Sequence, residues 1–168
     1  NEAVSDAKIT CFGEKTAVIF GSCIGGVRSG ERYYGGFPTK ENALNMPIAP
    51  IAVKIAEEYG AKGFVTNVAN ACAAGTMSIS IACDLIEQGK QEVAIVGGSD
   101  AFSGVPFAGF LALHALDPKG CSPFNRSEGI TLGEGAGALI VESYEHAKKR
   151  GAKIYGEVAG YGLSGDGY

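Results

Sequence analysis

Short apolar runs alternate with amphipathic stretches along most of this chain, and glycine or proline separates them. Five runs are rich in β-branched or aromatic residues and are too short for typical helices. They predict strands at 16–21, 63–70, 92–101, 136–143 and 153–162.

Four other stretches have helical character. In residues 47–60 the apolar positions share one helical face, and Gly60 follows as a stop signal; these positions are Ile48, Ile51, Ala52, Ile55 and Ala56. Further helices are predicted at 73–88, closed by Gly89, and at 105–116, stopped by Asp117-Pro118. A short surface helix follows Ser143, which is placed to cap it. Residues 27–46 show no clear period and predict an irregular segment.

The order of these elements predicts the fold class. The strand at 63–70, the helix at 73–88 and the strand at 92–101 form a β-α-β unit, whose two strands should be parallel. We therefore expect an α/β domain that spans residues 1–168 as a single unit. Both ends appear unfinished, which indicates that the sequence is part of something longer.

Composition narrows the class of protein. Apolar residues make up 46% of the 168 residues and charged residues 19%, which favours one ordered domain with a sizeable core. The net charge is −4 and the basic residues are scattered, so we expect no nucleic-acid partner. The sequence has neither a membrane-spanning apolar run nor a signal peptide, and we expect a cytoplasmic protein.

The five cysteines and two histidines argue against a structural zinc site, because no CxxC pair is present and the histidines lie far apart. An unpaired odd set predicts reduced thiols, most of them small buried residues. His114 is expected in the apolar core and His146 on a solvated helix. Glu134, between two glycines, is expected to accept hydrogen bonds from loop amides.

Glycine is unusually frequent, with 26 residues clustered at the ends of predicted elements. The clusters do not match a phosphate-binding loop: Gly89-Lys90 lacks the earlier glycine of a Walker motif, and the stretch GEGAGA precedes a strand rather than a helix. We therefore expect no nucleotide, and we expect neither a metal nor a cofactor.

Cys72 is the strongest candidate for chemistry. It lies between a predicted strand and a predicted helix, with small residues on both sides. Free amides and the helix dipole at such a junction favour the thiolate form of a cysteine. The same amides could stabilise the oxyanion formed when the thiolate attacks a carbonyl group. Local physics alone favours a nucleophile only slightly over small core filler.

Five motifs, in order, resemble the elongating β-ketoacyl-acyl carrier protein synthases, which have the thiolase-like fold. GSCIGG resembles the family's GSGIGG, NACAAG resembles [ST]ACA[TS]G, and VAIVGGSDA resembles VMVAGGxEA. SPFNRSEGITLGEGAG resembles RPFDxxRDGFVxGEGAG, and the final 27 residues resemble EEYEHAxxRGAxIYAEVxGYGxSxDAY. The resemblance covers the N-terminal half of that family and implies a mostly parallel sheet with helices on both faces.

The resemblance implies roles for three residues. Cys72 would be the nucleophile that accepts an acyl chain from a thioester, and its backbone amide would be one oxyanion donor. Ile24 and Phe110 would bind substrate at the acyl pocket. The resemblance also implies an acyl carrier protein as partner, acyl and malonyl thioesters as substrates, and a homodimer with the strand before Cys72 at its interface.

The family's two catalytic histidines and a lysine lie in its second half, and neither His114 nor His146 matches them. The sequence therefore predicts the acyl-accepting half of a decarboxylative Claisen condensation, and we expect the 168-residue chain alone to be inactive in condensation. Two alternatives remain open. One is a catalytically silent, ketosynthase-like partner subunit that serves as a dimerisation scaffold. The other is a different thiolase-like condensing enzyme, or a decarboxylase variant.

Overall fold

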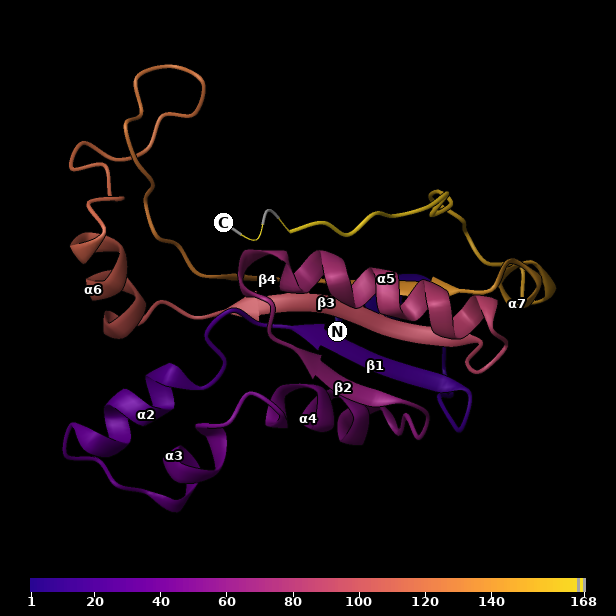
Figure 1. Ribbon diagram of the computed structural model, residues 1–168. Coiled ribbons are helices and arrows are strands. Elements are labelled where there is room, and N and C mark those ends of the chain that lie inside the picture. Colours follow the sequence, from indigo (N-terminus) through magenta and orange to yellow (C-terminus); the bar gives the residue numbers. More distant parts are fainter. Residues whose placement is uncertain (166, 168) are drawn as a thin grey trace.

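A computed structural model describes residues 1–165 and 167, and its centre is a four-stranded sheet (Figure 1). The strands lie in the order β2-β1-β3-β4, with both β2 and β3 parallel to β1 and with β4 antiparallel to β3. Their bounds are β1 (Thr16–Gly21), β2 (Val65–Val68), β3 (Val93–Asp100) and β4 (Gly135–Glu142).

Helices cover both faces of this sheet. In chain order they are α1 (Glu2–Ala7), α2 (Val27–Tyr34), α3 (Lys40–Asn45), α4 (Pro50–Tyr59), the short 3₁₀ helix η1 (Ala71–Ala73), α5 (Ala74–Glu87), α6 (Gly104–Ala112) and α7 (Tyr144–Lys149). The prediction of a mixed α/β domain with a mostly parallel sheet is thus confirmed, including the parallel orientation of β2 and β3.

The central strand β1 separates two apolar cores, because successive side chains point to opposite faces of a sheet. Val18 and Phe20 lie on the face covered by α4, together with Ala52 and Ala56 of that helix. Ile19 lies on the other face, against α5. All six residues of β1 are buried, as expected for a parallel strand covered on both sides.

Glycines let α5 approach the sheet closely. A Cβ atom added at Gly21 would lie 2.5 Å from the backbone nitrogen of Gly75, and one added at Gly98 would lie 3.2 Å from the Cα atom of Gly75. Ser78 fixes this contact, since its hydroxyl accepts a hydrogen bond of 3.2 Å from the amide of Gly97 on β3. Gly21, Gly75 and Gly98 are therefore packing sites for a helix on a sheet.

Asn67 ties α4 to β1 and β2. Its side-chain oxygen accepts a hydrogen bond of 2.9 Å from the amide of Ala52, which is one of the unpaired amides in the first turn of α4. Its side-chain nitrogen donates to the carbonyl oxygen of Phe20 at 2.9 Å. The residue before α4 is Ala49, which cannot cap the helix itself, so a neighbouring strand supplies the cap.

Several predictions are wrong. Residues 27–46 form α2 and α3 rather than an irregular segment, and the side chain of Thr39 caps α3 by accepting from the amide of Asn42 at 3.1 Å. Residues 153–162 are not a strand: they run as an extended segment (Figure 1) but pair with no other strand in the described part of the chain. The Tyr161 hydroxyl donates to Asp84 of α5.

The expected burial of most cysteines is also wrong, because only Cys83 is buried and the other four are exposed. His114 is exposed at the end of α6 rather than part of a core. His146 is half-buried rather than fully solvated, and its ring contacts Glu142 at 2.7 Å.

Candidate active site

Cys72 lies at the junction between β2 and α5, in the short helix η1 that precedes α5. The residue before it, Ala71, has a φ of 55°, a left-handed conformation that is rare for a residue with a Cβ atom. Backbone strain of this kind is concentrated at functional sites, where the surrounding structure holds it in place. The junction leaves the Cys72 side chain exposed. The amides of η1 lie in a first helical turn, where intrahelical partners are missing.

The Cys72 side chain opens onto a hollow of about 440 Å³, which we call the Cys72 hollow. The carboxyl ends of β1 and β3, the start of α5 and the segment that leads into β4 all contribute to its lining, which includes Gly21, Ser22, Gly98, Asp100 and Glu134. Ligands bind at the carboxyl ends of strands in open parallel sheets, so the hollow has the position expected for a substrate site.

Asp100, the last residue of β3, holds the segment that follows β1. Its Oδ1 accepts hydrogen bonds from the Ser22 hydroxyl at 2.6 Å and from the amide of Ile24 at 3.1 Å. The amide of Cys23 lies 3.0 Å from both carboxylate oxygens. The Ser22 hydroxyl in turn accepts from the amide of Gly25 at 2.8 Å. We call these contacts the Asp100 network; they fix residues 22–25 at the rim of the Cys72 hollow.

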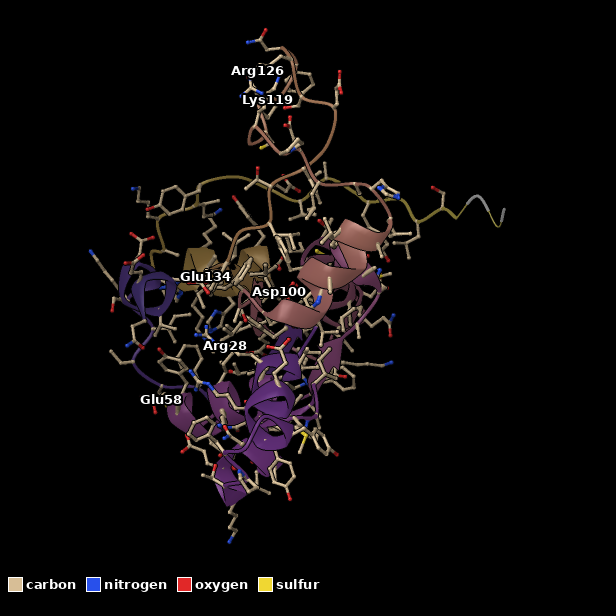
Figure 2. All side chains as sticks on the ribbon, turned by 90° about the vertical axis from the view of Figure 1, so that its left-hand side faces the viewer. Arg28, Glu58, Asp100, Lys119, Arg126 and Glu134 are labelled. Carbon is tan, nitrogen blue, oxygen red and sulfur yellow. The ribbon has the colours of Figure 1, made fainter. Side chains whose placement is uncertain are left out.

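A second polar group lies beside this network. Figure 2 shows Asp100, Glu134 and Arg28 gathered in one region, with Lys119 and Arg126 far away at the tip of a loop. Glu134 accepts a hydrogen bond of 3.1 Å from the amide of Phe102, and Arg28 of α2 lies 3.7 Å from the same carboxylate oxygen. The prediction that Glu134 accepts a loop amide is therefore confirmed.

Glu31 of α2 reaches the start of α6 and acts as its cap. Its Oε1 accepts a hydrogen bond of 2.6 Å from the amide of Val105. Ser103, in the N-cap position of α6, makes no side-chain capping bond. Contacts from α2 therefore position both α6 and the glycine-rich segment that leads into β4.

Cys23 is the second thiol of this region. Burial, the Asp100 carboxylate and the neighbouring Cys72 side chain together raise the pKa of Cys23 above its ordinary value. Cys23 is therefore in the protonated thiol form at neutral pH.

The predicted residues differ in how close they lie to Cys72. Ile24 belongs to the Asp100 network, and its side chain is half-buried at the rim. Phe110 is half-buried on α6. Neither side chain is among the residues that line the Cys72 hollow in the described part of the chain. Their predicted roles at an acyl pocket thus stay predictions.

Sequence reasoning did not identify Ser22, Arg28, Glu31 or Asp100 as parts of this region. Asp100 carried the clearest signal, because it is an acid that ends an otherwise apolar strand after a glycine pair. Such a position at the carboxyl end of a buried parallel strand indicates a site residue. Glu31 carried no comparable signal, since its partner lies 74 residues away in sequence.

Two further observations concern metal ions and membranes. Among residues 1–165 and 167, no group of three or more His, Cys, Asp or Glu side chains has the geometry to hold a metal ion. Within the same residues, every helix is too short or too polar to cross a membrane.

Comparison with known proteins finds similar sequences and similar solved structures. The chain is 37% identical to nodulation protein E of Rhizobium meliloti (strain 1021); the match covers 100% of this chain and 45% of that protein. It is 36% identical to 3-oxoacyl-[acyl-carrier-protein] synthase 2 of Staphylococcus aureus over 99% of this chain and 46% of that one. A similar chain also occurs in a solved structure of a type II PKS acyl-carrier protein in complex with its ketosynthase bound to the hexaketide. The TM-score is 0.87 and the sequence identity is 29%, and the match covers 98% of this chain and 46% of that chain.

The chain thus spans about half the length of the curated relatives that it matches. Residues 1–147 match the family described as "Beta-ketoacyl synthase, N-terminal domain". The match to this family and the structural likeness agree with the motifs around Cys72 and the glycine-rich segments. The chain therefore belongs to the beta-ketoacyl synthase family and corresponds to its N-terminal half.

Proposed function

We propose that this chain supplies the acyl-accepting half of a 3-oxoacyl-acyl carrier protein synthase, with Cys72 as the nucleophile. The observation that carries the proposal is the position of Cys72. It is an exposed thiol in the first turn before α5 and opens onto a hollow at the carboxyl ends of β1 and β3. Membership of the beta-ketoacyl synthase family supports the same reaction class.

In the proposed first step, the Cys72 thiolate attacks the carbonyl carbon of an acyl thioester. A carbon–sulfur bond forms, and the oxyanion receives a hydrogen bond from the backbone amide of Cys72. Collapse of this intermediate breaks the original thioester bond and releases the sulfur of the carrier as a thiolate, which takes a proton from water. The acyl group then remains on Cys72.

The second step would need other groups. Decarboxylation of a malonyl thioester produces a carbanion that attacks the acyl-cysteine, and in the resembled family two histidines and a lysine of the second half assist it. His146 lies on α7 and contacts Glu142, and His114 lies at the exposed end of α6. Neither lines the Cys72 hollow, so we propose that residues 1–168 alone do not condense.

We also propose an acyl carrier protein as the donor and a homodimer as the working state. S. aureus 3-oxoacyl-[acyl-carrier-protein] synthase 2 and the complex with an acyl-carrier protein support the first point. The position of β2 supports the second, because it is an edge strand of the sheet, and an unpaired edge is a template for pairing with another chain. The expected cytoplasmic location stays a prediction.

An acylation experiment tests the proposal. The protein is incubated with octanoyl-acyl carrier protein, digested and mapped by mass spectrometry. We expect one octanoyl group, on the peptide that contains Cys72, and its loss in a Cys72→Ala variant. A Cys121→Ala variant, which removes another exposed thiol, should be acylated like the native protein.

Acylation spread evenly over the exposed thiols, or none at all, would contradict the assignment. That outcome would favour the silent partner subunit. Detection of 3-oxoacyl product from malonyl-acyl carrier protein with residues 1–168 alone would contradict the proposed division between the two halves.

A further inference from the structure

Cys23 and Cys72 are brought together by the contact between β1 and α5. Gly21 lies so close to α5 that an added Cβ atom would be 2.5 Å from the backbone nitrogen of Gly75. Cys23 follows Gly21 by two residues, and Cys72 precedes α5 by the same number. Consecutive Cα atoms are about 3.8 Å apart, so the two cysteines lie within a short reach of this contact.

The backbone of Cys23 is fixed at that place. Its amide lies 3.0 Å from both carboxylate oxygens of Asp100, and Asp100 lines the same hollow as Cys72. Both cysteines are free and exposed. The resembled motif GSGIGG has glycine where this chain has Cys23, so the second thiol is a feature of this sequence.

The electrostatics of Cys23 agree with this placement. Its pKa is raised by burial, by the Asp100 carboxylate and by the Cys72 side chain. The raised pKa of Cys23 keeps it protonated, and a protonated thiol reacts slowly with peroxides. Cys23 is thus suited to act second, after its neighbour has been oxidised.

We propose that Cys23 and Cys72 form an oxidative modification site, in which a peroxide oxidises Cys72 and Cys23 then traps it as a reversible disulfide. The disulfide would protect Cys72 from irreversible oxidation and would switch off its nucleophilicity. The second consequence rests on the proposed acyl transfer, whereas the disulfide itself does not.

The chemistry balances with hydrogen peroxide as the oxidant. In the first step a sulfur–oxygen bond forms on Cys72 as the peroxide bond breaks, which gives a sulfenic acid and one water molecule. In the second step the Cys23 sulfur attacks the Cys72 sulfur, the sulfur–oxygen bond breaks, and a second water leaves with the Cys23 proton. The two thiols together lose two electrons to the peroxide. A dithiol reductant returns them by thiol–disulfide exchange.

Peroxide treatment followed by peptide mapping tests the site. The reduced protein is exposed to hydrogen peroxide, the remaining thiols are alkylated, and the digest is analysed with and without dithiothreitol. We expect a Cys23–Cys72 cross-linked peptide that disappears on reduction. In a Cys23→Gly variant, Cys72 should accumulate as sulfinic acid, so that the share recovered by dithiothreitol falls from nearly all to nearly none. A matched Cys121→Ala variant should behave like the native protein.

Two results would overturn the inference. One is a Cys72 cross-link to a different cysteine. The other is equal loss of Cys72 to sulfinic acid in the native protein and in the Cys23→Gly variant. Acylation of Cys72 is measured separately on the reduced native protein, so failure of the disulfide and failure of the proposed acyl transfer remain distinguishable.

Discussion

The carboxylate of Asp100 accepts a hydrogen bond of 2.6 Å from the hydroxyl of Ser22 and thereby joins the end of β3 to the residue that follows β1. The same carboxylate accepts the amides of Cys23 and Ile24. One acidic side chain therefore fixes the conformation of residues 22–25 beside Cys72. Hydrogen bonds to a charged group are worth about 1.5–3 kcal/mol each, more than ordinary ones.

Replacement of Asp100 should loosen this segment. We expect Asp100→Asn to lower the free energy of unfolding by about 2 kcal/mol, because the neutral amide carries only one acceptor oxygen for the donors that face it. Hydrogen exchange at the amides of Cys23 and Ile24 should accelerate more than exchange in β1. The matched control is Glu58→Gln, an exposed acid on α4 that lies far from the network (Figure 2). Equal exchange at residues 22–25 in both variants would contradict the role of Asp100.

The close approach of α5 to β1 makes a second prediction. Gly21→Ala places a Cβ atom 2.5 Å from the backbone nitrogen of Gly75, and backbone cannot move aside as a flexible side chain can. We expect a loss of about 1–3 kcal/mol in the free energy of unfolding, measured by urea denaturation. Gly109→Ala serves as the control, because the added Cβ meets nothing within 4 Å. Its position in α6 should make this change neutral or stabilising. A Gly21→Ala protein as stable as the native one would contradict the packing.

The pH dependence of stability should reflect Glu142. Burial of Glu142 opposes ionisation, but hydrogen bonds from Arg150 and His146 outweigh it and hold the pKa of Glu142 below its ordinary value of 4.5. Arg150 donates from Nε at 2.7 Å and also donates from Nη1 to the carbonyl oxygen of Ala7 at 2.6 Å. The ion pair therefore joins α7 to β4 and to the end of α1.

The direction of this pH dependence follows from the number of protons that each state binds. The folded state binds fewer protons than the unfolded state near pH 4.5, so the stabilisation is present above that pH and is lost as the pH falls through the lower pKa of the folded state. We expect Glu142→Gln to lower the free energy of unfolding by about 2 kcal/mol at neutral pH. The difference from the native protein should shrink in acid. Glu145→Gln, an exposed acid of α7, should show no such dependence. A difference that stays constant with pH would exclude an ionic role.

The stability of the first turn of α6 should depend on Glu31. Glu31→Ala removes the acceptor for the amide of Val105, and loss of a helix cap costs about 1 kcal/mol. We expect faster hydrogen exchange in the first turn of α6 and little change in β1 or β3. Glu57→Ala, an exposed acid of α4, is the matched control. Unchanged exchange in α6 would show that another group caps the helix.

The core strands were predictable because their signals are local. The buried parts of β1 and β3, residues 17–20 and 93–96, are runs of apolar residues, and such short runs are typical of strands that are covered on both faces. The helix over 74–87 and the stop at Gly60 were predictable for the same reason. Cys72 was found because its junction can be inferred from the change of pattern on either side of it.

The wrong predictions concern features that local sequence patterns do not determine. The segment at 153–162 has strand-like composition, but a strand exists only where a partner offers a row of hydrogen bonds, and sequence pattern does not identify the partner. α2 and α3 are short and contain no buried residue, so they lack the apolar core positions that mark the longer helices. Cysteine burial was wrong because composition predicts an average and not the position of a particular thiol.

The sequence by itself determined the α/β class, the parallel core of the sheet, the junction that presents Cys72, and the family resemblance. These properties depend on local periodicity and on residue order, which are written directly in the chain. Tertiary structure alone decided that Asp100 would hold residues 22–25, that Glu31 would cap α6, and that Cys23 would lie beside Cys72. The Asp100 and Glu31 contacts join residues that are 74 to 78 positions apart, and 49 positions separate Cys23 from Cys72. They exist only after the parallel strands have aligned their carboxyl ends and the glycines have let α5 pack against them.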